Sequence, residues 1–133
     1  MISAENLAQV SIVLPIYNEG KYIRETLESI VNQDYRNLEV IVSDNHSSDQ
    51  PSIIWEEFAQ KDDRICYHRH SNNIGVLPNH IFSINKILGK YFMIASGHDK
   101  WSTNLISECV YLLEFCSSAS VAYGTPSWIG EDG

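Results

Sequence analysis

Four short polar segments carry the side chains most able to do chemistry, and each follows a stretch that is apolar or contains apolar residues. The segments are residues 17–20, 44–49, 71–75 and 96–100, and they are rich in acidic residues, Asn, His and Gly. Carboxylate and imidazole groups can hold a divalent cation, and a cation can bridge such groups to a phosphate. The spacing therefore points to a polar ligand, such as a diphosphate, held by several loops.

Composition limits the kind of ligand and partner. The 133 residues contain 9 Lys plus Arg against 17 Asp plus Glu, a net charge of −8. So acidic a chain is a poor partner for nucleic acid or for an anionic membrane surface. The sequence also lacks the GxGxxG dinucleotide fingerprint, the GxxxxGK[ST] phosphate loop and the GxSxG nucleophile elbow. A phosphate group would have to be held locally, by backbone N–H groups, a metal or a few side chains.

The elements that position these loops alternate along the chain. Apolar runs predict strands, and apolar residues at helical spacing predict a helix after each of the first four runs. We expect an α/β fold with a Rossmann-like, mostly parallel sheet and helices on both faces, in which ligands bind at the carboxyl ends of the strands. The predicted strands are 10–16, 38–43, 64–69, 91–95 and 120–123.

Apolar spacing and capping residues locate the helices. In the third helix, Leu77, Ile81, Ile84 and Leu88 form an apolar stripe that we expect to be buried, and the helix should start near Pro78 and stop at Gly89. Asn18 and Asp49 are expected to cap the first and second helices.

Four motifs, in order, resemble family-2 glycosyltransferases, which have the GT-A fold. The run Val10–Glu19 is similar to the family's opening, and Glu39–Asp49 is similar to its V-D-D-G-S-x-D segment. Asn73-Ile74-Gly75 matches its N-x-G, and Ser96–Trp101 stands at the place of its metal-binding D-x-D loop. Each motif is weak alone, but the series covers residues 10 to 101 at the family's spacing.

The resemblance implies roles for individual side chains around a nucleotide. Tyr17 would stack on the base, Glu19 would lie at the same mouth, and Asn45 stands where the family has a second Asp. The implied nucleotide-binding residues are Pro15, Tyr17, Glu19, Asp44, Asn45, Asn73 and Gly75.

The metal loop departs from the family's pattern. Ser96 and His98 stand where two Asp residues are usual, and Asp99 follows. The resemblance implies a divalent cofactor, Mn²⁺ or Mg²⁺, held by His98 and Asp99, and an imidazole shifts the preference toward Mn²⁺. Lys100 could supply part of the charge instead.

The expected function is transfer of a sugar from a nucleotide-diphosphate sugar, in the first place a UDP-sugar, with inversion, to a carbohydrate or lipid-linked acceptor. Residues 1–133 would form a single domain, the donor-binding part, and the catalytic base is expected beyond Gly133 rather than at Glu131 or Asp132. The alternative is a non-catalytic nucleotide-binding or interaction module, which the departures at Ser96 and His98 favour. A receiver-like domain is disfavoured, because residues 64–71 contain no Asp to phosphorylate.

Location and redox state follow from simple absences. No apolar stretch approaches the ~18 residues of a membrane span, and the first six residues do not resemble a signal peptide. Cys66, Cys109 and Cys116 lack metal-site spacing and are expected to be small buried residues in a reducing environment. We therefore expect a cytoplasmic protein, with association at the inner face of the membrane as a further expectation; the sequence leaves the oligomeric state open.

Overall fold

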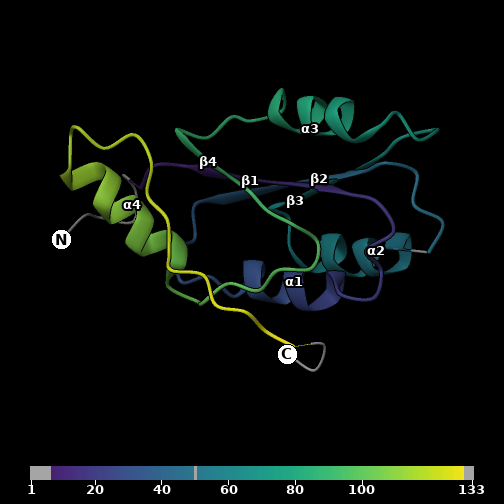
Figure 1. The fold of residues 1–133 in the computed structure, drawn as a ribbon, viewed down its shortest axis with the longest axis horizontal. Coiled ribbons are helices and arrows are strands. Elements are labelled where there is room, and N and C mark those ends of the chain that lie inside the picture. The colour runs from purple at the N-terminus through teal and green to yellow at the C-terminus, as the bar shows by residue number, and fades with distance from the viewer. Residues whose placement is uncertain (1–6, 50, 131–133) are drawn as a thin grey trace.

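A computed structural model describes residues 7–49 and 51–130. Four strands form one parallel sheet in the order β3-β2-β1-β4, so the two central strands are the first two in the chain (Figure 1). The bounds of the strands are β1 Val10–Ile16, β2 Leu38–Asp44, β3 Ile65–Arg69 and β4 Tyr91–Ile94. The bounds of the helices are α1 Ile23–Val31, α2 Pro51–Lys61, α3 Val76–Ile84 and α4 Leu105–Phe115. The four predicted helices and the first four predicted strands are confirmed, although α3 ends at Ile84 and not at Gly89 as predicted.

The core lies around the central strands. Ile12 and Leu14 of β1 and Val42 of β2 are fully buried, because helices cover both faces of the sheet. Helices α1 and α2 lie on one face and α3 lies on the other (Figure 1). Trp55 of α2 is also fully buried and stacks on Tyr67 of β3, with ring centroids 5.6 Å apart. The predicted α/β sheet with helices on both faces is therefore confirmed.

Helix α3 packs on the sheet with a different side from the predicted one. The apolar stripe was expected to be buried, but a polar side faces the sheet. Leu77 and Ile81 are largely exposed, whereas Asn79 and Ser83 are buried. The helix begins at Val76 and ends at Ile84, so Leu88 lies beyond it and is also exposed. Polar contacts to the end of β2, described below, orient this helix and override its apolar stripe.

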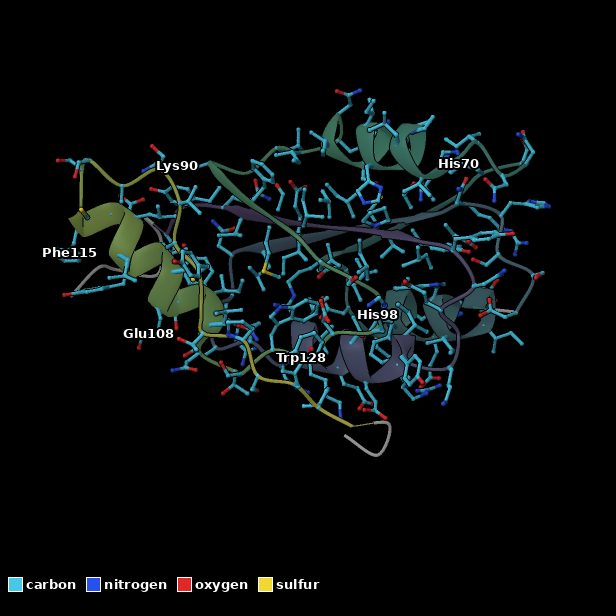
Figure 2. All side chains as sticks on the ribbon, in the orientation of Figure 1. His70, Lys90, His98, Glu108, Phe115 and Trp128 are labelled. Carbon is cyan, nitrogen blue, oxygen red and sulfur yellow. The ribbon has the colours of Figure 1, made fainter. Side chains whose placement is uncertain are left out.

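Two smaller predictions about the chain are wrong. No strand forms at residues 120–123; the chain there is irregular. Cys66 and Cys116 are exposed and Cys109 is half-buried, although no disulfide joins the three. Large apolar side chains are also exposed near the end of the described chain, such as Phe115 on α4 and Trp128 beyond it (Figure 2).

Some predictions concern residues outside the described part of the chain. The first six residues, which were expected not to form a signal peptide, belong here, as do Glu131 and Asp132. Within the described residues, no helix is long and apolar enough to cross a membrane.

Candidate functional site

The loop after β1 is tied to the loop after β2 by several hydrogen bonds. The backbone N–H of Asn18 donates to Ser47 Oγ at 2.9 Å, and Asn18 Oδ1 accepts from the N–H of Ser48 at 2.8 Å. The N–H of Gly20 donates to Asp49 Oδ2 at 2.6 Å. Asn18, with φ of 56°, therefore bridges two loops instead of capping α1, whose first residues have no side-chain cap. These bonds join the carboxyl ends of the two central strands into one rigid edge.

Asp44, at the end of β2, is completely buried and its carboxylate is fully engaged. Oδ1 accepts from the N–H of Ser47 at 2.8 Å, Oδ2 accepts from the Tyr67 hydroxyl at 2.7 Å, and Arg69 Nε lies 3.9 Å away. Burial, together with the bond to Asp44, raises the pKa of Tyr67 well above its usual value. In this arrangement Asp44 braces the loop that follows it, and it does not line the cavity described below.

Asn45 organises the loop between β3 and α3. Its Oδ1 accepts from the N–H of Ile74 at 2.8 Å, and its Nδ2 donates to Asn73 Oδ1 at 3.0 Å and to the Gly75 carbonyl at 3.2 Å. Asn73 Oδ1 also accepts from the N–H of Gly75 at 2.8 Å. Gly75 has φ of 92°, in the left-handed region that a glycine adopts without strain. The structure thus brings together three of the predicted site residues.

A cavity of about 450 Å³ opens at the carboxyl ends of β1, β2 and β4. Five predicted site residues line it: Pro15, Tyr17, Glu19, Asn45 and Asp99. Tyr17 is 49% exposed and lines this cavity, so its ring is accessible from this space. Asp44, Asn73, Gly75 and His98, although predicted, do not line the cavity. The residues that sequence reasoning missed are Ile16, Val76, Asn79, His80, Ile94, Ala95 and Ser96.

Asn79 belongs to a buried polar cluster that fixes α3 above the end of β2. Ser43 Oγ donates to Asn79 Oδ1 at 2.6 Å, and Asn79 Nδ2 donates to the Ser43 carbonyl at 3.0 Å. His70 Nε2 lies 3.0 Å from Ser43 Oγ and 3.1 Å from Asn79 Oδ1. Because an amide oxygen only accepts, Nε2 carries the proton here. The available sequence signal was a pair of polar residues, Asn79 and Ser83, at i and i+4 on one side of a largely apolar helix.

The loop after β4 is anchored by α1 and by the loop that precedes α1. Thr26, buried in α1, donates from Oγ1 to the Asp99 carbonyl at 2.9 Å. Glu19 Oε1 lies 3.1 Å from His98 Nδ1. Burial raises the pKa of Glu19, because the loss of water disfavours the charged carboxylate more than the bond to His98 favours it.

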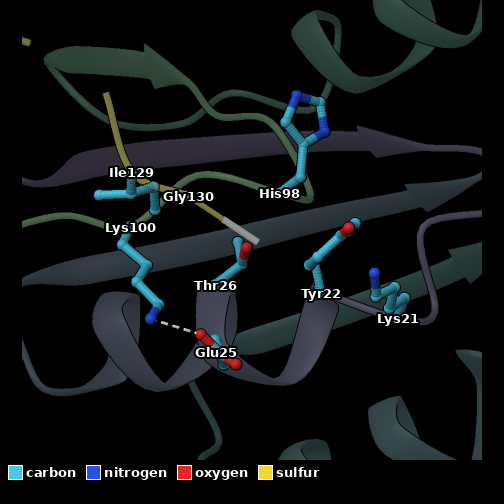
Figure 3. Close-up of a pocket in the computed structure, with 8 residues that line it drawn as sticks. All are labelled: Lys21, Tyr22, Glu25, Thr26, His98, Lys100, Ile129 and Gly130. Atoms are coloured by element: carbon cyan, nitrogen blue, oxygen red, sulfur yellow. Dashed lines mark ion pairs between the residues drawn. The ribbon is translucent and has the colours of Figure 1, made fainter. Parts of the chain in front are cut away.

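His98 and Asp99 face different cavities. Asp99 lines the 450 Å³ cavity, whereas His98 lines a neighbouring cavity of about 340 Å³ together with Lys21 and Lys100 (Figure 3). Lys100 Nζ pairs with Glu25 Oε2 at 2.5 Å, so its charge is already partly matched. The cavity next to the candidate site is therefore the more cationic of the two.

The donor set suits a divalent cation only in part. In residues 7–49 and 51–130, no group of three or more His, Cys, Asp or Glu side chains is placed to hold a metal ion. The Asp99 carboxylate accepts no hydrogen bond from the part of the chain that the structure describes, and Nε2 of His98 is likewise unengaged. Because His98 and Asp99 line different cavities, the 450 Å³ cavity offers a cation only the Asp99 carboxylate of this pair, and most of the other ligands would have to come from a bound diphosphate.

Comparison with known proteins defines the class of this molecule. Residues 11–133 match the family described as Glycosyl transferase family 2, and the chain belongs to that family. It is 34% identical over 97 residues to glycosyltransferase GlyG of Streptococcus pneumoniae serotype 4, a match that covers 73% of this chain and 32% of GlyG. Glycosyltransferase GlyA of the same organism is 29% identical over 116 residues, 87% of this chain and 16% of GlyA.

Solved structures agree on the fold. The structure of S. aureus TarS 1–349 in complex with UDP superposes with a TM-score of 0.74 at 24% identity, over 80% of this chain and 32% of that one. The mannosyltransferase PcManGT from Pyrobaculum calidifontis, in complex with GDP-Man and Mn²⁺, gives 0.74 at 23% identity, over 83% of this chain and 33% of that one. The fold is thus that of GT-A glycosyltransferases, and the chain spans about a third or less of the length of these relatives.

Proposed function

We propose that this chain binds the nucleotide-diphosphate sugar of a glycosyltransferase, with a UDP-sugar as the first candidate donor. The observation that carries the proposal is the 450 Å³ cavity, which places the accessible Tyr17 ring and the Asp99 carboxylate around one space. An aromatic ring offers a base a stacking surface, and a carboxylate can share a cation with a diphosphate. TarS was solved with UDP and PcManGT with GDP-Man, which supports a nucleotide donor of this type.

The proposed reaction is an inverting substitution at the anomeric carbon. An acceptor hydroxyl forms the new bond, the bond to the diphosphate breaks, and the hydroxyl proton passes to a carboxylate base. We propose that this base lies in a part of the protein that follows residue 133. The binding site for the acceptor, a carbohydrate or a lipid-linked sugar, is proposed to lie there too. Residues 1–133 are then the donor-binding part.

A divalent cation, Mn²⁺ or Mg²⁺, is proposed to accompany the nucleotide and would neutralise charge that develops on the leaving diphosphate. Asp99 would hold it through its carboxylate; for His98 to add Nε2, its side chain, which lines the neighbouring cavity, would have to turn toward Asp99. The PcManGT complex with Mn²⁺ supports this choice of ion. A cytoplasmic location, with contact at the inner membrane face, remains a prediction that fractionation of cells would check.

Titration calorimetry tests the donor site. The protein is titrated with UDP, GDP and dTDP, and then with UDP-sugars, each with and without Mn²⁺. Binding of one nucleotide with affinity in the micromolar to millimolar range, about −8 to −4 kcal/mol, supports the proposal. The absence of binding by every nucleotide would refute it and leave the second candidate.

The second candidate is a non-catalytic interaction module derived from this fold. It is favoured by the loss of two acidic positions in the 96–99 loop, where Ser96 and His98 stand. Measured sugar transfer or donor hydrolysis by the protein would exclude it.

A further inference from the structure

The fourth strand, β4, has a free edge. Among the described residues it is an outer strand of the sheet and pairs with β1 alone. The N–H groups of Tyr91 and, just after the strand, Ala95 donate to carbonyls of β1. Because the backbone groups of successive residues point to opposite sides of a strand, those of Phe92 and Ile94 face away from β1. These N–H and C=O groups can therefore bond to a further strand.

The side chains of Phe92 and Ile94 are also uncovered. In the register of the sheet they stand beside Ser11 and Val13, on the face where Ser43 bonds to α3. Helix α3 packs mainly over β1 and β2 on that face. Phe92 is consequently 56% exposed and Ile94 50% exposed. Two large apolar side chains on an outer strand thus have no helix above them.

A cavity lies against the opposite face of the same strand. It has a volume of about 620 Å³ and is enclosed by β4, α4 and residues 122–129. Its lining is largely apolar and includes Tyr91, Met93, Trp101, Leu105, Cys109 and Tyr123. The free edge of β4 therefore has apolar surface on both of its sides.

The other outer strand, β3, is different. Its exposed side chains include His68 and Arg69, and polar or charged residues on an outer strand discourage pairing with a further strand. The charged residue next to β4 is Lys90, whose Nζ already pairs with Glu114 Oε1 at 2.7 Å. Of the two edges, β4 is the one that a further strand fits.

The relatives contain polypeptide that could occupy this edge. The match covers 32% of GlyG and 16% of GlyA, and the family match continues to residue 133 of this chain. Most large apolar side chains that are exposed fall in residues 76–129, and exposed apolar surface of this extent marks an interface. A second copy fits less well, because each chain carries a net charge of −8 and two copies repel each other.

We propose that polypeptide following residue 133 adds a strand to the free edge of β4 and thereby completes the sheet. Neighbouring strands lie about 4.8 Å apart, so alternate side chains of the added strand would lie beside Phe92 and in the 620 Å³ cavity. Both sets are then apolar, as in a strand that is buried on both faces. The proposal shares with the proposed function the part of the protein after residue 133, but it does not depend on the donor site.

Hydrogen exchange tests the proposal on the unmodified protein. The gene is read past the codon for residue 133, its whole product is purified, and the exchange of individual amides is followed by NMR. The amides of Phe92 and Ile94 report on the free edge of β4. The amide of Tyr67 is the matched control, because the even-numbered residues of β3 bond to β2 and Tyr67 faces the outer side.

We expect the amides of Phe92 and Ile94 to exchange at least about 100-fold more slowly than that of Tyr67, because amides bonded inside a sheet open only with a large part of the fold. Sedimentation should show the same protection in the monomer at every protein concentration.

A pair of variants gives a second readout. Phe92→Lys should raise the equilibrium constant for unfolding of the whole product by about 10- to 100-fold, because a buried aromatic side chain is lost. Ile53→Lys, at a residue of α2 that is 65% exposed, should change it by less than about threefold. Urea denaturation measures both.

Four results would overturn the proposal. They are a gene that ends at residue 133, amides of Phe92 and Ile94 that exchange as fast as that of Tyr67, equal effects of Phe92→Lys and Ile53→Lys, and protection that disappears when a dimer is diluted to monomers. The last result would make a second copy the occupant. If the amides are protected and no nucleotide binds, the added strand stands and the donor site is refuted.

Discussion

The side-chain amide of Asn45 donates a hydrogen bond to Asn73 Oδ1 at 3.0 Å, across two loops that are 28 residues apart in the chain. The same amide nitrogen donates to the Gly75 carbonyl, and the Asn45 amide oxygen accepts from the N–H of Ile74. Asn45, which lines the cavity, thus uses both its donor and its acceptor to hold the 73–75 loop beside it. An aspartate, which the family usually has at this position, could not make the two donated bonds.

Asn45→Asp should therefore lower the stability of the protein. The carboxylate would face Asn73 Oδ1 and the Gly75 carbonyl without a proton to share, and we expect a loss of about 1–3 kcal/mol in the free energy of unfolding. UDP affinity should fall with it, because the 73–75 loop would move. Urea denaturation and calorimetry measure the two effects. Asn72→Asp, at an exposed neighbour, is the control; an equal loss there would show that added negative charge alone is responsible.

Asp44→Ala should destabilise the protein more than Asp49→Ala. Removing the buried carboxylate leaves Tyr67 and the N–H of Ser47 without their acceptor, at a cost of about 3 kcal/mol. Asp49 is exposed and loses one bond from Gly20, worth about 1 kcal/mol. We also expect Asp44→Ala to weaken nucleotide binding more, because it loosens the loop that carries Asn45. Chemical denaturation of both variants checks the order, and the reverse order would contradict the bracing role of Asp44.

Tyr67→Phe should lower stability at neutral pH by about 1–2 kcal/mol, because the hydroxyl that bonds Asp44 is lost. The pKa of Tyr67 is raised in the folded protein, mainly by burial and then by Asp44. Its contribution is therefore present in full below the unfolded value of about 10 and is lost as the pH rises above it. Thermal unfolding of both proteins from pH 7 to 11 should show the difference shrinking at the alkaline end. Tyr123→Phe, at a highly exposed tyrosine, should show no such difference at any pH.

Ser96→Asp should strengthen the dependence of nucleotide binding on Mn²⁺. Ser96 lines the cavity beside Asp99, so a carboxylate there would add an oxygen ligand on the proper side of the loop. We expect UDP affinity in Mn²⁺ to rise about tenfold, equivalent to ~1.4 kcal/mol, and affinity without metal to stay the same or fall. Ser71→Asp, in an exposed loop that does not line the cavity, is the matched control. If the UDP affinity of Ser96→Asp is the same with and without Mn²⁺, the proposed site does not hold a cation.

The sequence by itself determined the order of the elements and the edge of the sheet at which polar loops gather. Apolar runs such as Val10–Ile16 and Leu38–Asp44 can only be buried between two layers, and their alternation with helices makes the sheet parallel. The carboxyl ends of parallel strands share one edge, so the meeting of Tyr17, Asn45 and Asp99 around one cavity followed from pattern alone.

Only the tertiary structure decided which side chains line the cavity at that edge. Asp44 and Asn45 are neighbours of similar polarity, yet one is closed in by Tyr67 and the other lines the cavity. Periodicity shows which side of an element is apolar, but not what covers it. In α3, bonds from Asn79 to Ser43 outweigh an apolar stripe and turn Leu77 outward, because a buried polar group must find its partner. The contact between Glu19 and His98 likewise depends on two loops meeting in space, which residue spacing along the chain cannot express.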